Sequence, residues 1–240
     1  MSKDVFVVME QRDGEIQKVG IELLGQASKL AQDLGEKVVA VLFGYQIKAQ
    51  AQKCIAYGAD KVLVVDDKEL EEYLTEPYAL ALTQIIREEE PEIVLYGASS
   101  IGRDLAPRVS ARIRTGLTAD CTGLAIDPET KLMQMTRPAF GGNIMARIIT
   151  PRTRPQFCTV RYKVFSAVAP NHDAAGTVLR MPVSDSWQDT RVTIESAEMK
   201  PPEKDISEAD ILVAVGRGLK SAADLAKVQA FCSAIGAQLA

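Results

Sequence analysis

Histidine and cysteine are scarce in this chain of 240 residues. It has one histidine, His172, and four cysteines, none of them in a Cys-x-x-Cys pair: Cys54, Cys121, Cys158 and Cys232. Zinc and iron–sulfur sites need several imidazole or thiolate ligands at short spacing, so we expect neither. Scattered cysteines without a pairing pattern favour reduced, mostly buried thiols and a cytoplasmic protein.

The sequence also lacks an excess of basic residues and a long apolar run. Lysine and arginine number 28 against 32 aspartates and glutamates, which gives a formal net charge of -4. A nucleic-acid surface needs a basic stripe, so nucleic acid is not an expected partner. No basic segment leads into a long apolar run near Met1. We therefore expect neither a secretory signal nor a transmembrane helix.

No pairing of a nucleophile with a base is visible. The chain has no Gly-x-Ser-x-Gly motif and no cysteine–histidine arrangement that would mark a catalytic site. His172 lies in Pro-Asn-His-Asp, a loop composition, where a solvated side chain is favoured over a catalytic one. Asp104 and Asp120 flank glycine turns, where aspartates usually cap helices. The sequence therefore assigns no residue a catalytic role.

Strands and helices alternate over the first half of the chain. Continuous apolar runs, typical of strands buried on both faces, cover Val5–Met9, Lys37–Phe43, Lys61–Val65 and Ile93–Tyr96. Helical spacing covers Ile16–Leu34, Gln46–Tyr57, Thr75–Glu89 and Arg103–Ile113, with Thr75 as the expected cap of its helix. The alternation predicts an α/β fold: a mostly parallel open sheet with right-handed crossovers and helices on both faces.

A glycine-bearing turn, Gly97–Gly102, joins the fourth strand to its helix. It lies beyond the carboxyl end of a strand, where ligands of open α/β sheets bind, and bare N–H groups at a helix start suit an anion. The turn is not a phosphate-cradling loop of the Walker type, because Arg103 replaces the lysine. The favoured alternative is that the glycines only permit a tight turn. Whether AMP or ATP binds at this turn and at Gly116–Thr118 stays open.

After Gly116 the period changes to that of strands. Short runs cover Ala119–Ile126, Lys131–Thr136, Asn143–Thr150 and Gln156–Tyr162, separated by turns rich in proline and glycine. They predict an antiparallel meander whose free edge offers backbone groups to another chain. Four arginines fall here: Arg137, Arg147, Arg152 and Arg154. Two interpretations of these arginines are equally favoured. They could form a positive surface toward an anionic cofactor or an acidic partner, or they could be ordinary solvated arginines at turns.

The last third divides into a connection and a new strand–helix unit. The connection, 166–209, is rich in proline and holds two strand-like runs, Gly176–Val183 and Arg191–Ser196. Its Trp187 is expected to be a packing anchor rather than a flavin stacker. We therefore assign an α/β domain to 1–165, a connecting segment to 166–209 and the start of a second, Rossmann-like domain to 210–240.

The unit from residue 210 has the pattern of a strand, a glycine turn and a helix. Ile211–Val215 is the strand, Gly216-Arg217-Gly218 is the turn, and Ser221 caps a helix that ends near Ile235. Glycine at a strand end is common, so the turn alone is a weak sign of a dinucleotide site. One strand and one helix bury too little surface for an independent domain. We expect the unit to be mobile, packed on the first domain or completed by another polypeptide.

Four segments resemble, in order, the alpha subunit of the electron transfer flavoproteins. They are TEPYALALTQII, GASSIGRDLAPRVSARIRTGLTADCTGL, MTRPAFGGNIMARI with RPQFCTVR, and AVGRGLKSAADL. The chain departs from the family at Tyr162-Lys163, where Pro-Gly is usual, and it stops at Ala240, early in the family's second domain.

The resemblance implies a function. It implies that FAD is bound by the second domain at the Gly216-Arg217-Gly218 turn, with Arg217 in contact with the flavin nucleotide, and that the family's further FAD contacts lie beyond Ala240. It implies a heterodimer with the electron transfer flavoprotein beta subunit. Electrons would come from dehydrogenases such as the acyl-CoA dehydrogenases of fatty acid beta-oxidation and pass to a membrane quinone reductase or another acceptor. The lack of catalytic groups fits an electron carrier rather than an enzyme.

Two other functions stay open at this stage. The chain could be a stand-alone AMP- or ATP-binding module of the same fold, or a scaffold without a cofactor. Whether the complex bifurcates electrons is not decided by these residues.

Overall fold

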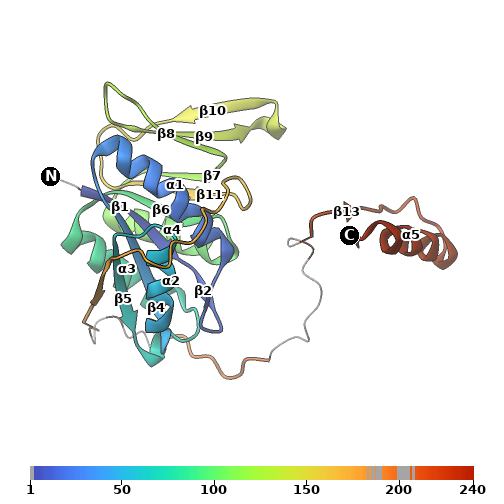
Figure 1. The fold of residues 1–240 in the computed structure, drawn as a ribbon, viewed down its shortest axis with the longest axis horizontal. Helices are drawn as coiled ribbons and strands as arrows, with labels where there is room; N and C mark the ends of the chain where they lie inside the picture. The colour runs from blue at the N-terminus through green and yellow to red at the C-terminus, as the bar shows by residue number, and fades with distance from the viewer. Residues whose placement is uncertain (1–2, 183, 185–186, 188–190, 199–205, 207–208) are drawn as a thin grey trace. The chain divides into compact units, whose positions relative to one another are not determined.

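The computed structural model describes residues 3–182, 184, 187, 191–198, 206 and 209–240. The chain forms two compact units, Met1–Val192 and Thr193–Ala240, which are described separately. Figure 1 shows the ribbon of both.

A sheet of seven parallel strands forms the centre of the first unit (Figure 1). Its order is β12-β5-β4-β1-β6-β11-β7. The strands are β1 (Lys3–Met9), β4 (Val38–Gly44), β5 (Lys61–Asp66), β6 (Pro91–Gly97), β7 (Leu117–Cys121), β11 (Gln156–Val160) and β12 (Thr177–Arg180). The chain runs outward from β1 through β4 to β5 and then returns to β6 on the other side of β1. The strand order therefore reverses between β1 and β6, the usual place of a ligand site in such folds.

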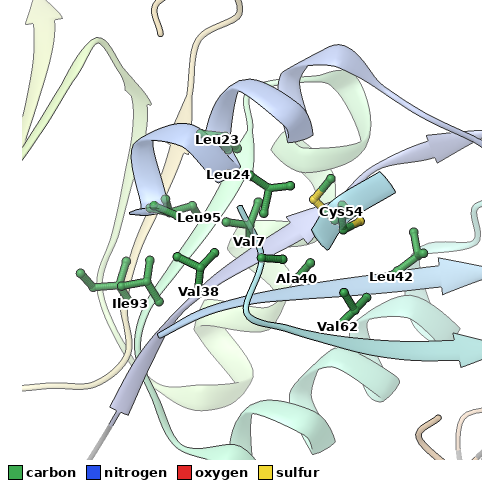
Figure 2. Close-up of a cluster of buried hydrophobic side chains, with 14 of the residues drawn as sticks. Val7, Leu23, Leu24, Val38, Ala40, Leu42, Cys54, Val62, Ile93 and Leu95 are labelled. Carbon is green, nitrogen blue, oxygen red and sulfur yellow. The ribbon is translucent and has the colours of Figure 1, made fainter. Parts of the chain in front are cut away.

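Helices cover both faces of this sheet. They are α1 (Lys18–Leu34), α2 (Gln50–Ala56), α3 (Thr75–Glu89) and α4 (Ser100–Ile113), with short 3-10 turns η1 (Ile47–Ala49) and η2 (Lys68–Leu70). Alternate side chains of β1 point to opposite faces. Val7 packs under α1 and α2, and Phe6 packs under α3 and α4. Figure 2 shows the first of these clusters, where Leu23 and Leu24 of α1 lie over the strands. The expected α/β fold is confirmed.

One expected helix cap is wrong. Thr75 is the first residue of α3, and Leu74 is the N-cap, without a side-chain hydrogen bond. The Thr75 hydroxyl instead donates to Asp104 Oδ2 of α4 at 2.5 Å. Its side chain links two helices rather than capping one.

The predicted meander is only partly present. An antiparallel sheet has the order β10-β9-β8, with β8 (Gly123–Ile126), β9 (Met133–Ala139), β10 (Ile144–Ile148) and the turn η3 (Phe140–Gly142). The expected strand Ala119–Ile126 is divided between β7 of the main sheet and β8. The expected strand at Gln156–Tyr162 is wrong as a member of the meander, because β11 lies between β6 and β7 and runs parallel to both.

The connecting segment contributes to the first unit. β12 pairs in parallel with β5, so the strand-like run Gly176–Val183 is confirmed over Thr177–Arg180. The run Arg191–Ser196 forms no strand, and its residues are exposed. The sequence boundaries at 165/166 and 209/210 do not coincide with the division of the chain at Val192.

The second unit is a small β-α-β arrangement. It has β13 (Leu212–Val213), α5 (Ala222–Ile235) and β14 (Gln238–Leu239), and the two strands are parallel. Ser221 caps α5 as predicted, accepting a hydrogen bond from the Asp224 N–H at 3.2 Å. A hairpin in the first unit, β2 (Gln11–Arg12) with β3 (Glu15–Ile16), completes the described elements. None of the helices in these described ranges has the length and apolar content needed to cross a bilayer.

Candidate functional site

The glycine turn between β6 and α4 uses its own backbone donors. Ser99 is the N-cap of α4, and its hydroxyl oxygen accepts the Gly102 N–H at 2.8 Å. The Ser99 carbonyl oxygen accepts the Arg103 N–H at 2.9 Å. Ser99 is buried. An anion at this helix start would therefore have to displace a formed cap, which contributes about 1 kcal/mol.

Both glycines of this turn are required by packing. A Cβ at Gly97 would lie 2.7 Å from Val19 Cγ1, and a Cβ at Gly102 would lie 1.9 Å from the Gly97 carbonyl oxygen. Real Cβ atoms do not come this close to a carbonyl oxygen. The geometry therefore supports the tight-turn interpretation of the motif rather than an anion cradle.

The crevice where the strand order reverses is filled by side chains. The cavity that remains beside Gly97 and Gly102 has a volume of about 20 Å³. This is room for roughly one water molecule, whereas ligand pockets are typically about 300–1,000 Å³. Gln11 contributes to the filling, since its Nε2 donates to the Glu71 carbonyl oxygen at 3.2 Å and to Tyr78 Oη at 3.4 Å. The geometry gives no room for AMP or ATP here.

A charged cluster lies at the same edge, at the ends of β7 and β11. Both Arg161 Nε and Nη2 donate to the Asp120 carboxylate, at 2.9 and 2.6 Å, and Arg103 lies 3.6 Å from it. The hydrogen bonds from Arg161 hold the pKa of Asp120 below its usual value. Beside it, burial raises the pKa of Tyr162, while a hydrogen bond with Ser99 acts in the opposite sense. Tyr162, one of the two departures from the family pattern, thus packs against the cap of the turn.

Neither aspartate that flanks a glycine turn caps a helix. Asp120 lies in β7 with a φ of 63°. Asp104 accepts hydrogen bonds from the hydroxyls of Tyr73, at 2.7 Å, and Thr75. Burial acts to raise the pKa of Asp104, but these two hydrogen bonds and the charge of Arg108 outweigh it, and the pKa is lowered. Both carboxylates are occupied in structural contacts, so the expected capping role is wrong.

The four arginines of the second half do not form one site. Arg154 pairs with Glu92 and donates to the Thr150 carbonyl oxygen at 3.1 Å, which is a structural role at the amino end of β6. Arg137 donates to the neighbouring Pro138 carbonyl oxygen at 3.4 Å. Arg147 and Arg152 are exposed. The expectation of a common positive surface is not supported by these separate contacts.

The antiparallel sheet presents apolar side chains to solvent. Phe140 is 85% exposed and Met145 of β10 is 56% exposed, and Ile144 and Ile149 are also largely exposed. β10 pairs with β9 alone among the strands described. An edge strand with exposed apolar side chains is typical of a surface that pairs with another chain.

The turn of the second unit differs from the turn after β6. Gly216, Arg217 and Gly218 are exposed, and a Cβ at either glycine would meet nothing within 4 Å. Packing within the described chain therefore does not explain these glycines. An exposed guanidinium beside a glycine turn and a helix start suits a pyrophosphate, and the Asp224 carboxylate in the first turn of α5 is offset by Lys227 at 3.6 Å.

The remaining predicted residues are placed as follows. His172 is exposed in a loop. Trp187 is 5% exposed and packs with the cluster under α3 and α4, as expected of an anchor. All four cysteines are buried and free. Within the described ranges, no group of three or more His, Cys, Asp or Glu side chains could hold a metal ion.

Sequence reasoning missed a carboxylate that joins α3 to α4. Glu76 contacts both Arg108 and Arg112 through short ion pairs, and Arg191 lies 3.8 Å from it. The spacing of Arg108 and Arg112, four residues apart on one helix face, was the available signal. Nothing in the sequence identified the partner helix.

Comparison with known proteins gives one family. The model of the electron transfer flavoprotein domain matches residues 5–186. A lactate dehydrogenase (NAD(+),ferredoxin) subunit LctC of Acetobacterium woodii is 44% identical over 99% of this chain and 57% of its own length. The electron transfer flavoprotein subunit alpha of Thermoanaerobacterium thermosaccharolyticum is 46% identical over 90% of this chain and 66% of its own. The electron transfer flavoprotein subunit alpha of Clostridium acetobutylicum is 41% identical over 99% of this chain and 72% of its own length.

The chain thus spans between about half and three quarters of the length of these relatives. The matches cover the parallel sheet, the glycine turn and the antiparallel strands. The resemblance seen in the four sequence segments is confirmed, and the chain belongs to the electron transfer flavoprotein family, as a protein of the alpha-subunit type.

Proposed function

We propose that this chain acts as the alpha subunit of a heterodimeric electron transfer flavoprotein and that its second unit begins the FAD-binding domain. The observation that carries the proposal is the exposed Gly216-Arg217-Gly218 turn at the start of a β-α-β unit, in a chain of this family. The crevice of the first unit, by contrast, leaves about 20 Å³. The glycine turn of the first unit therefore leaves no room for a cofactor, and the exposed turn of the second unit is the proposed site.

FAD would supply the electron-transfer chemistry, and the protein would supply position and charge. The guanidinium of Arg217 would neutralise the pyrophosphate, and the two glycines would let the backbone approach it closely. In this role the chain is a carrier, not a catalyst. It needs no nucleophile or general base, and the carboxylates of Asp104 and Asp120 are committed to hydrogen bonds and ion pairs.

The proposed partner is an electron transfer flavoprotein beta subunit, which would pack on the exposed apolar edge formed by β9, η3 and β10. Electron donors would be dehydrogenases such as acyl-CoA dehydrogenases, and the acceptor a quinone reductase or another protein. The Acetobacterium woodii relative is a lactate dehydrogenase (NAD(+),ferredoxin) subunit, so a lactate dehydrogenase is an alternative donor. A complex that bifurcates electrons is an alternative arrangement.

Co-purification with a beta subunit tests the proposal. The natural full-length protein is co-expressed with the beta subunit, and the visible absorbance of the purified complex is compared with its protein content. We expect a heterodimer with stoichiometric flavin. Arg217→Ala should lower flavin retention, Arg217→Lys should restore part of it, and the exposed neighbour Lys220→Ala serves as the matched control.

Two outcomes would contradict the proposal. One is a full-length protein that forms no complex with a beta subunit and carries no flavin. The other is stoichiometric AMP or ATP binding by the chain alone in isothermal titration calorimetry, which would favour a stand-alone nucleotide-binding module.

A further inference from the structure

Trp187, the only tryptophan of the chain, packs the connecting segment against the first unit. It is 5% exposed and packs in the cluster formed by α3, α4 and the strands beneath them. Its indole Nε1 donates to Gln84 Oε1 at 2.6 Å, and its backbone N–H donates to the Ser184 carbonyl oxygen at 2.9 Å. The apolar ring is buried and its only polar atom has a partner.

The acceptor of this hydrogen bond is itself held in place. Gln84 Nε2 donates to Glu88 Oε1 at 2.7 Å, one turn further along α3. The orientation of the Gln84 amide is thereby defined, with its oxygen toward the indole. α3 therefore presents a preformed seat for Trp187, made of an apolar surface and one directed acceptor.

Two further contacts bracket this seat along the chain. Before it, the Met181 N–H donates to the Val64 carbonyl oxygen at 2.9 Å, directly after β12. After it, Arg191 Nη2 lies 3.8 Å from the Glu76 carboxylate of α3. Residues 192–198 are exposed and form neither helix nor strand. Val192 is the last residue of the first compact unit.

We propose that Trp187 is a positioning residue, which fastens the connecting segment to α3 so that the β-α-β elements from Leu212 onward are tethered from Val192 rather than from the end of β12. This inference rests on the proposed function, in which the second unit carries the flavin. Its consequence is a limit on the length of chain between the anchored residues and β13.

The limit follows from chain length. A fully extended chain spans at most about 3.5 Å per residue, so the 20 residues from Val192 to Leu212 reach about 70 Å. Counted from Met181, the tether would have 31 residues and a reach of about 110 Å. Release of Trp187 would lengthen the chain that precedes the β-α-β elements and lower their local concentration at any partner bound to the first unit.

Fluorescence of the unmodified chain tests whether the seat is occupied in solution, because all tryptophan emission comes from Trp187. We expect a blue-shifted emission and acrylamide quenching several-fold weaker than for N-acetyltryptophanamide. Emission and quenching equal to those of the free indole compound would overturn the proposal.

Limited trypsin digestion tests whether Trp187 holds the segment. We expect cleavage after Arg191 to be at least tenfold faster in Trp187→Ala than in the unmodified chain. Trp187→Phe keeps an apolar ring in the seat and should stay within about threefold of the unmodified rate. Ile194→Ala, an exposed apolar residue of the same segment, is the matched control and should leave the rate unchanged.

A second set of cleavage sites separates an anchor from an ordinary core residue. Lys131 is an exposed trypsin site in the first unit, far along the chain from Trp187. If cleavage after Lys131 rises in Trp187→Ala as much as cleavage after Arg191, the substitution unfolds the whole unit and the positioning role is wrong. Equal cleavage after Arg191 in the unmodified chain and in Trp187→Ala would also overturn it.

The flavin-loaded heterodimer of the full-length protein gives the functional readout. In Trp187→Ala we expect turnover with the dehydrogenase to fall about twofold or more, at unchanged flavin content. Unchanged turnover would overturn the positioning role. A complex that lacks flavin in the unmodified protein would count against the proposed function, whereas the fluorescence and trypsin results do not depend on flavin.

Discussion

A Cβ atom on Gly102 would lie 1.9 Å from the carbonyl oxygen of Gly97, so the first turn of α4 sits directly on the end of β6. Gly102→Ala must push the helix away from the strand or break the Ser99 cap. We expect the free energy of unfolding of the first unit to fall by about 3 kcal/mol or more, the upper range for overpacking. Urea denaturation followed by circular dichroism measures the change.

Gly116→Ala is the matched control for this prediction. A Cβ at Gly116 would lie 3.4 Å from Thr150 Oγ1, close to ordinary contact, and Gly116 is exposed. We expect a change within about 0.5 kcal/mol, typical of surface substitutions. Equal losses in the two variants would show that the approach of α4 to β6 is not tight in solution.

The fold was predictable where burial is continuous and local. The apolar runs of β1, β4, β5 and β6 show strands buried on both faces, because each buried position must itself be apolar. β11 has the same strand period as the runs that precede it, so nothing local in the sequence separates it from the meander. Its polar residues Gln156 and Thr159 are buried and bind groups that are distant in sequence. Gln156 Oε1 accepts the Met133 N–H at 2.9 Å, and Thr159 Oγ1 accepts the Asp120 N–H at 2.9 Å.

Contacts between residues that are distant in sequence also limit prediction of the site. Ser221 could be recognised as a cap because the serine and the N–H that it accepts are three residues apart. The side chains that fill the crevice could not be predicted, since Gln11 and Tyr78 are 67 residues apart in sequence and meet only in the fold. A glycine motif at a strand end therefore predicts a turn reliably, but not whether the space beyond it is open.

Lys163→Gly should stabilise the first unit. Lys163 has a φ of 53°, in the left-handed region that costs a residue with a side chain about 1 kcal/mol. Glycine removes this cost but adds entropy to the unfolded chain, so we expect a net gain of about 0.5 kcal/mol. That corresponds to a rise in Tm of about 1–2 °C, measurable by differential scanning fluorimetry.

Lys163→Ala separates the backbone effect from loss of the lysine side chain. Alanine keeps the unfavourable φ, and the Lys163 N–H can still donate to Glu22 Oε2, a bond of 2.9 Å. We expect no gain in Tm. A rise equal to that of Lys163→Gly would assign the effect to the side chain and contradict the backbone argument.

The Arg161–Asp120 pair should make stability depend on acid pH. The hydrogen bonds from Arg161 hold the pKa of Asp120 below the ordinary value of 3.8. A carboxyl whose pKa is lowered by folding stabilises the protein above the unfolded pKa, and this contribution is lost as the pH falls through the folded pKa. Because the pair is partly exposed to solvent, we expect Asp120→Asn to cost less than about 1 kcal/mol at pH 7.

The difference in free energy of unfolding between Asp120→Asn and the unmodified chain should shrink as the pH falls from 5 to below 3.8. Urea unfolding at each pH measures this difference. NMR titration of the Asp120 carboxyl checks the pKa directly. Arg161→Lys is the matched control, because lysine keeps the charge but loses the two-pronged geometry. It should move the Asp120 pKa part of the way back toward 3.8. A difference that does not vary with pH would show that the carboxylate contributes through packing alone.

Charge placed on the apolar edge should prevent the proposed pairing with a beta subunit. Met145 is 56% exposed on β10 and Phe140 is 85% exposed in the adjoining turn, so neither side chain has much packing to lose within the chain. We expect Met145→Lys and Phe140→Lys to change the free energy of unfolding by less than about 0.5 kcal/mol. An unpaired lysine at the centre of an interface should weaken heterodimer formation by about 30-fold or more. Val192→Lys, at an exposed apolar site away from this edge, is the control and should bind normally. Isothermal titration with the beta subunit measures the affinity, and retention of binding within threefold in both edge variants would place the interface elsewhere.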